Sequence, residues 1–153
     1  MPNTKTVRVK HLGGIDAAYQ MPHHYDSAKP TVILVNSFTT DSELYRSQYA
    51  NQALTDKLNL LAIEPLGHGQ TRTKSENFTY WDSAIMNIQV MDALGIDKAF
   101  ALGTSQGGWI VARMALVAPD RVCALEAPRH DEALELTMPV DTRHHPARHV
   151  DGL

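Results

Sequence analysis

Residues 99–110 read AFALGTSQGGWI. The segment 98–102, which is apolar from Ala99 onward, predicts a short strand, and the apolar residues of 109–117 predict a helix. The turn between them is Gly-x-Ser-x-Gly, with Ser105 at its centre. A strand, a tight turn and a helix in this order form the setting of a nucleophile elbow. The stretch therefore predicts that Ser105 is a nucleophile.

The residue types around Ser105 fit this chemistry. A sharp turn holds the serine in a strained backbone conformation, and the small residues Gly103 and Gly107 avoid clashes within it. The turn also places the hydroxyl at the start of the next helix, where the helix dipole favours developing negative charge. The backbone N–H of Gln106 is then a natural donor to an oxyanion.

The glycine-rich turn at 103–108 has an alternative use, because such a turn can cradle a phosphate and make a nucleotide or flavin site. Its spacing fits neither Gly-x-Gly-x-x-Gly nor a P-loop with its lysine. The nucleophile is therefore the favoured reading, and no cofactor is predicted.

Strands and helices alternate on both sides of this stretch. Runs that are apolar on both faces are typical of a parallel sheet covered by helices, and Gly13-Gly14 predicts an antiparallel hairpin at the start. The class is thus α/β with three layers, a mostly parallel sheet and an antiparallel N-terminal hairpin. The remaining predicted strands are 6–9, 15–19, 31–35 and 60–63, the remaining predicted helices are 41–57 and 80–94, and 67–77 is predicted to be a loop.

The composition changes after Val122. Residues 123–153 contain no Lys, Ile or aromatic residue but four of the eight histidines. Apart from a short candidate strand at 122–125, the periodicity there is poor. We therefore expect one domain part at 1–122 and a poorly structured tail at 123–153. The abrupt change also favours the hypothesis that a shifted reading frame or a retained intron replaced the natural C-terminal half.

The composition of the 153 residues excludes several classes of function. A net charge of −3 without a basic cluster argues against nucleic-acid binding. One cysteine cannot form an internal disulfide, and neither a signal peptide nor a membrane span is recognisable, so a cytoplasmic location is expected. His23-His24 and the tail histidines lack acidic or cysteine neighbours at a site-like spacing, so no metal is predicted.

Four segments in order resemble the α/β-hydrolase fold superfamily, in its single-domain esterase, lactonase and acyltransferase-like branch. The resemblance covers roughly residues 6–122. The four segments are 31–38, 64–69 (EPLGHG), 103–108 (GTSQGG) and 118–122 (APDRV). In this family the strand order is one, two, four, three, five, six, seven, eight, and the chain is expected to supply the first five and a stub of the sixth.

The resemblance assigns further roles. It implies that Phe38 supplies the second oxyanion N–H, although Asn36 and Ser37 replace the family's usual His and Gly. It implies a structural loop around His68, with no catalytic role for that histidine. Trp81 and Trp109 are expected in the core or the pocket wall rather than as substrate-stacking residues.

A complete triad in this family needs an acid and a histidine after the nucleophile. Glu126 and His144 match that order, with His145 and His149 as alternative bases. The expected activity is serine hydrolysis or transfer of an acyl group from a small ester, lactone or thioester. The alternative is a truncated, non-catalytic remnant that acts, if at all, by binding. Ending the sheet early would leave a strand edge exposed, so self-association is also expected.

Overall fold

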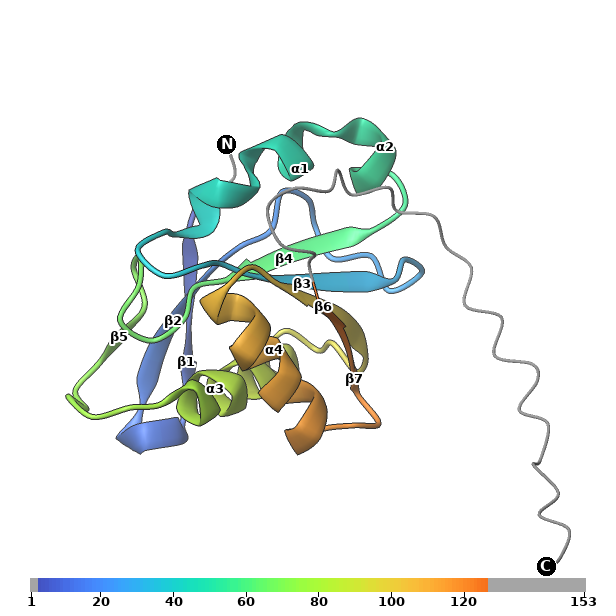
Figure 1. Cartoon of the computed structure of the whole chain (residues 1–153). Helices are drawn as coiled ribbons and strands as arrows, with labels where there is room; N and C mark the ends of the chain where they lie inside the picture. Colours follow the sequence, from blue (N-terminus) through green and yellow to red (C-terminus); the bar gives the residue numbers. More distant parts are fainter. Residues whose placement is uncertain (1–2, 127–153) are drawn as a thin grey trace, which may run out of the picture.

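The protein was analysed as a computed structural model, which describes residues 3–126. Its elements form one mostly parallel sheet with helices on both faces (Figure 1). This confirms the predicted α/β class and the antiparallel N-terminal hairpin. The strands are β1 (Lys5–Val9), β2 (Ile15–Gln20), β3 (Thr31–Val35), β4 (Asn59–Ile63), β5 (Arg72–Thr73), β6 (Ala99–Gly103) and β7 (Val122–Glu126).

The strand order is β1-β2-β4-β3-β6-β7, and the short β5 pairs with β2 outside this path. β1, β2 and β4 pair antiparallel, whereas β4, β3, β6 and β7 are parallel. When β5 is left out of the numbering, this strand order is the one, two, four, three, five, six that the family resemblance implied. The family's sixth strand corresponds to β7 here. It is more than the predicted stub, because it pairs with β6 along five positions. Among the described residues, the sheet therefore has free edges along β1 and along β7.

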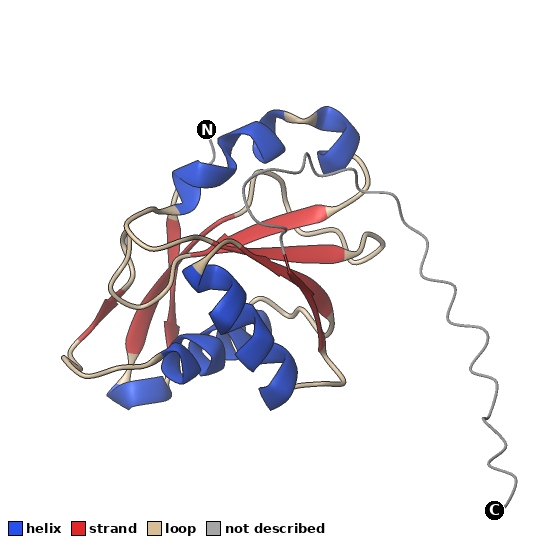
Figure 2. Ribbon diagram, in the orientation of Figure 1, coloured by secondary structure: helices blue, strands red, loops and turns tan. Residues whose placement is uncertain are grey.

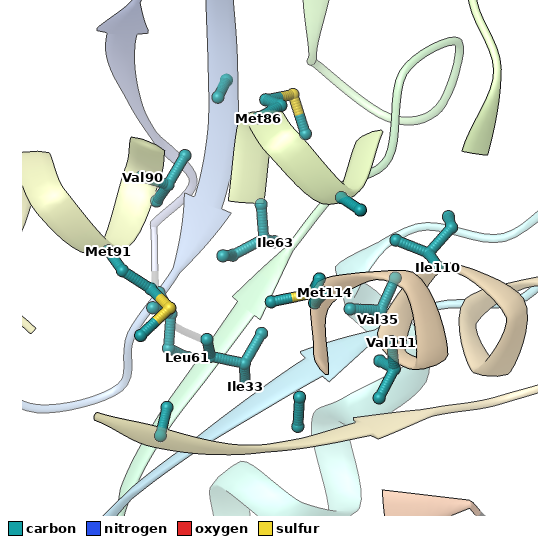
Figure 3. Close-up of a cluster of buried hydrophobic side chains, with 14 of the residues drawn as sticks. Ile33, Val35, Leu61, Ile63, Met86, Val90, Met91, Ile110, Val111 and Met114 are labelled. Atoms are coloured by element: carbon teal, nitrogen blue, oxygen red, sulfur yellow. The ribbon is translucent and has the colours of Figure 1, made fainter. Parts of the chain in front are cut away.

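The central strands are buried on both faces, and their side chains alternate between two cores. Ile33 and Val35 join the larger core under α3 (Tyr80–Ala93) and α4 (Gln106–Val117). Leu34 joins a smaller core on the opposite face, together with Tyr45 and Tyr49. Figure 2 shows the helices on the two sides of the sheet, and Figure 3 shows the larger core.

Capping residues set both the start and the end of the helix α3, close to the bounds 80–94 that the sequence predicts. At its start, the Asp82 carboxylate accepts a hydrogen bond of 2.6 Å from the Thr79 N–H. At its end, Gly95 has a φ of 70°, and the Ile96 N–H donates to the Met91 carbonyl at 2.9 Å. That bond closes a Schellman motif, for which a left-handed glycine is the usual residue. Capping residues thus set the length of α3.

The segment predicted as one helix at 41–57 is instead three short ones, which corrects that prediction. They are the 3-10 helix η2 (Ser42–Tyr45), α1 (Arg46–Ala50) and α2 (Gln52–Thr55). Asn51 is the break: it has extended backbone angles, and its side chain accepts from the Leu54 N–H as an N-cap. A capping residue competes with helix continuation.

Two further predictions were wrong in detail. The loop predicted at 67–77 contains β5, whose two polar residues pair with Ile15 and Asp16 of β2. The apolar pattern of 80–94 predicts that Ile85, Ile88 and Met91 share the buried face of α3, but only Met91 is buried, and Ile85 and Ile88 are half-buried. The residues that α3 buries are Ser83, Ala84, Met86, Asn87, Val90 and Met91. Within residues 3–126, no helix is both long and apolar enough to cross a membrane.

Candidate active site

The turn between β6 and α4 has the strained geometry that the sequence predicts. Ser105 has a φ of 52° and a ψ of −114°, and its side chain is exposed. A β-carbon on Gly103 would overlap the backbone of Gly107, and one on Gly107 would overlap the Val35 carbonyl. Only glycine fits both positions, so the two glycines allow the tight turn that presents Ser105.

A second turn, residues 36–40, lies beside the first. The two are joined by a hydrogen bond of 3.1 Å from the Thr104 N–H to the Val35 carbonyl. The buried Asn36 side chain donates to the Thr40 carbonyl at 2.7 Å, which holds the turn closed from inside. Phe38 is at the tip and is 66% exposed. The asparagine found in place of the family's histidine therefore organises the turn that carries Phe38.

The two residues predicted to bind the oxyanion line one cavity. Phe38 and Gln106 come from turns that follow β3 and β6, and they lie on the same cavity of about 530 Å³. Ser105 directly precedes Gln106 in the chain but is not among the cavity's lining residues. The first N–H groups of a helix have no acceptor within it, so the Gln106 N–H at the start of α4 is available. The roles of Ser105, Gln106 and Phe38 in catalysis remain predictions.

A chain of hydrogen bonds crosses the cavity wall through the Gln106 side chain. The Tyr80 hydroxyl donates to Gln106 Oε1 at 3.4 Å, and Gln106 Nε2 lies 3.3 Å from His68 Nε2. His68 Nδ1 lies 3.1 Å from the Leu66 carbonyl, which can only accept. Nδ1 therefore carries the proton, and Nε2 accepts from Gln106. His68 thus contacts the side chain of a predicted oxyanion residue, a role that its loop position in sequence did not indicate.

A buried carboxylate supports the loop that carries His68. Glu64, which follows β4, accepts hydrogen bonds from the Ser42 hydroxyl and the Gln70 N–H, both at 2.6 Å. Burying a carboxylate is costly unless it is hydrogen-bonded. Glu64 therefore fixes both the loop at 65–71 and the start of η2. The sequence feature that could have indicated this role is that Glu64 is an acidic residue directly after an apolar strand.

Two buried tyrosines on the opposite face are not candidate bases. Burial raises the pKa of Tyr45 to about 12. Burial also raises the pKa of the Tyr49 phenol, and the charges of Tyr45 and Glu64 act in the same direction. A phenol with a raised pKa is neutral near pH 7 and holds its proton, so neither tyrosine is suited to deprotonate Ser105.

Of the predicted acid and base, only the acid Glu126 is among the residues that the structure describes. The backbone of Glu126 is the last position of β7 and pairs in register with Gly103, two residues before Ser105. Glu126 is therefore at the same end of the parallel sheet as Ser105. His144, and the alternatives His145 and His149, lie outside the described residues. Within residues 3–126, no histidine hydrogen-bonds the Ser105 hydroxyl.

The two tryptophans contradict their predicted place in the core or pocket wall. Trp81 is 44% exposed and Trp109 is 64% exposed, and neither lines the cavity. Their rings and that of Tyr80 surround the Arg113 guanidinium, whose carbon is 5.2 Å from the Trp81 centroid. Cation–π attraction of this kind stabilises a partly exposed cluster. The tryptophans therefore connect α3 to α4 at the surface.

The fold and this site geometry define an α/β-hydrolase-type protein. Residues 30–133 match the family described as "alpha/beta hydrolase fold". The chain therefore belongs to the α/β-hydrolase fold family.

Individual relatives are similar to parts of the chain. A 95-residue stretch is 30% identical to the dihydrolipoyllysine-residue acetyltransferase component of the acetoin cleaving system of Cupriavidus necator, covering 62% of this chain and 25% of that protein. A 79-residue stretch is 33% identical to 3-oxoadipate enol-lactonase 1 of Acinetobacter baylyi, covering 52% and 29%. A solved hydrolase from Pseudomonas aeruginosa superposes with a TM-score of 0.66 at 27% identity, covering 77% and 43%. The chain thus spans less than half of each of these relatives.

Proposed function

We propose that Ser105 is the nucleophile of a serine hydrolase that acts on the carbonyl of an ester, lactone or thioester. The observation that carries this proposal is the elbow geometry: an exposed serine with a φ of 52°, next to a cavity lined by Phe38 and Gln106. The names of the relatives support it, since one is an enol-lactonase and another an acetyltransferase. A cytoplasmic location is part of the same proposal, supported by the single cysteine.

The chemistry follows from the groups in place. The Ser105 Oγ attacks the carbonyl carbon, the carbonyl π electrons move to the oxygen, and the Gln106 and Phe38 N–H groups donate to that oxyanion. A base takes the serine proton and returns it to the leaving oxygen or sulfur. In this proposal Glu126 and His144 act as acid and base. Water or another acceptor then attacks the acyl group on Ser105 and releases it.

Intact-mass labelling with a fluorophosphonate tests whether Ser105 is activated, because the probe reacts only with a nucleophilic serine. We expect one adduct on the wild type and none on Ser105→Ala. Ser47→Ala is the matched control, since Ser47 is an exposed serine on α1, and it should label like the wild type. Loss of labelling in His144→Ala, but not in His145→Ala, would identify the base.

A non-catalytic protein that acts by binding is the second candidate function. It is favoured by one observation, that no histidine among residues 3–126 contacts the Ser105 hydroxyl. A serine without a base is a poor nucleophile at neutral pH. Absence of labelling on wild-type protein with the circular dichroism of a folded α/β chain would reject the hydrolase and support this alternative.

A further inference from the structure

The cavity beside Ser105 is lined without any carboxylate, lysine or arginine side chain, and this feature specifies its ligand. Among its eleven lining residues there is no Asp, Glu, Lys or Arg. We infer that the cavity binds a neutral, largely apolar acyl group whose only polar atoms are carbonyl or ether oxygens. This inference rests on the proposed function, because it names the substrate class of the same site.

The apolar part of the lining is large and comes from three segments. The loop after β4 provides Leu66, the segment before α3 provides Phe78, and α4 provides the fully buried Ile110. A volume of about 530 Å³ is within the roughly 300–1,000 Å³ typical of small-molecule sites, which are mostly apolar. An acyl group of several carbons therefore fits, and its burial is favourable because apolar surface leaves water.

The nearby charged groups are engaged elsewhere. The Glu64 carboxylate accepts hydrogen bonds from Ser42 and Gln70, and Glu64 is not a lining residue. Arg113 lies 5.7 Å from the Tyr80 ring centroid, donates to the Trp109 carbonyl, and is not a lining residue. An anionic ligand would therefore lose its hydration without gaining an ion pair, which disfavours its binding.

Two polar groups that line the cavity, the Ser83 hydroxyl and the Gln106 side-chain amide, each have a hydrogen still available to donate. The buried Ser83 hydroxyl oxygen accepts from the Leu66 N–H at 3.3 Å, so its own hydrogen is left to donate. Gln106 Nε2 has two hydrogens and uses one toward His68. Both groups can donate to a carbonyl or ether oxygen.

Phe78 lines the cavity and is partly exposed, so we expect it to contact the ligand. Its side chain is 40% exposed, and a β-carbon built on Gly67 would lie 3.0 Å from its ring. The ring therefore packs closely over Gly67, which has a φ of 79°. Removing the Phe78 ring takes apolar surface away from the cavity, whereas enlarging Ile110 fills part of its volume.

Binding to the full-length Ser105→Ala protein tests the inference without any chemical step. The probes are N-phenyl-1-naphthylamine, which is neutral, and 8-anilino-1-naphthalenesulfonate, which has the same rings and one negative charge. We expect the neutral probe to bind at least about tenfold more tightly, because the lining offers no counter-ion. Phe78→Ala and Ile110→Phe, each added to Ser105→Ala, should weaken its binding by about fivefold or more.

Exposed apolar surface can also bind such probes, so Leu116→Ala is the matched control. Leu116 is 71% exposed on α4 and does not line the cavity, so this change should leave binding of the neutral probe unaltered. Circular dichroism establishes that each variant is folded. Tighter binding of the sulfonate, no binding of the neutral probe, or loss of binding in Leu116→Ala but not in Phe78→Ala would overturn the inference. Failure of the fluorophosphonate test would leave this result untouched, because Ser105→Ala has no nucleophile.

Discussion

Gly107 and Gly108 are adjacent in α4, but their surroundings differ. A β-carbon on Gly107 would overlap the Val35 carbonyl, whereas one on Gly108 would lie 3.6 Å from the Gly103 carbonyl, an ordinary contact. We predict that Gly107→Ala lowers the free energy of unfolding by about 1–3 kcal/mol through overpacking.

Gly108→Ala is the control for that prediction. It should leave stability unchanged or raise it by up to about 1 kcal/mol, because alanine is the better helix former. Urea denaturation of both variants measures the difference. Equal losses in the two would mean that the elbow tolerates a side chain at Gly107 and that the close approach to β3 is not required.

Single residues also show what sequence could predict at the site. The spacing of Gly103, Ser105 and Gly107 was sufficient to predict the strained elbow, because a local turn depends on adjacent residues. The contact between His68 and Gln106 was not predictable, since it joins residues 38 positions apart through the packing of two loops. The aromatic environment of Arg113 was missed for the same reason.

The helix α3 is attached to the N-terminal hairpin through the Asp82 carboxylate. Asp82 Oδ1 lies 2.8 Å from His11 Nε2, and Oδ2 accepts from Thr79. Burial of the carboxyl raises its pKa, but the hydrogen bonds from Thr79 and His11 outweigh this, so the pKa is lowered from 3.8. A lowered folded-state pKa means that folding favours the charged form.

The stabilisation by Asp82 should therefore be fully present above the unfolded pKa and should disappear as the pH falls through the folded value. We predict that Asp82→Asn costs about 1 kcal/mol at pH 6 and progressively less below about pH 4. Denaturation at several pH values measures this. Asp97→Asn, at an exposed position without a side-chain hydrogen bond among residues 3–126, should show no such pH dependence. A cost for Asp82→Asn that stays constant down to pH 2.5 would contradict the prediction.

At the scale of elements, apolar strands were the easiest to predict. Residues 31–35 were predicted to the residue because the strand is covered on both faces. β5 was missed because its two residues, Arg72 and Thr73, are polar and pair only through the backbone. The helix at 41–57 was predicted as continuous because its apolar stripe extends across Asn51, whose capping role depends on backbone angles rather than on periodicity.

The sheet formed by residues 3–126 ends at β1 on one side and at β7 on the other. β1 carries the charged residues Lys5 and Arg8, whereas Val122 and Cys123 of β7 are uncharged, so β7 is the edge more prone to pairing. Unpaired strand edges promote association, and a lysine on such an edge opposes it. We predict that the wild type forms concentration-dependent dimers or larger species, and that Cys123→Lys shifts the population toward monomer. Analytical ultracentrifugation measures both.

The control for the edge prediction is Cys123→Ser. Cys123 is exposed, so an intermolecular disulfide must be separated from strand pairing. Cys123→Ser should associate like the wild type in the presence of reductant. A wild type that sediments as a single monomeric species at all concentrations would show that the β7 edge is covered within the chain itself.

The two tryptophans of the protein, Trp81 on α3 and Trp109 on α4, both contact the Arg113 guanidinium at the surface. Intrinsic fluorescence therefore reports the contact between these two helices and not the burial of the sheet. If the helices separate before the strands unpair, the emission changes while the far-ultraviolet strand signal stays constant. Tryptophan fluorescence therefore detects, without an added label, a partial separation of α3 from α4, the helix that follows Ser105.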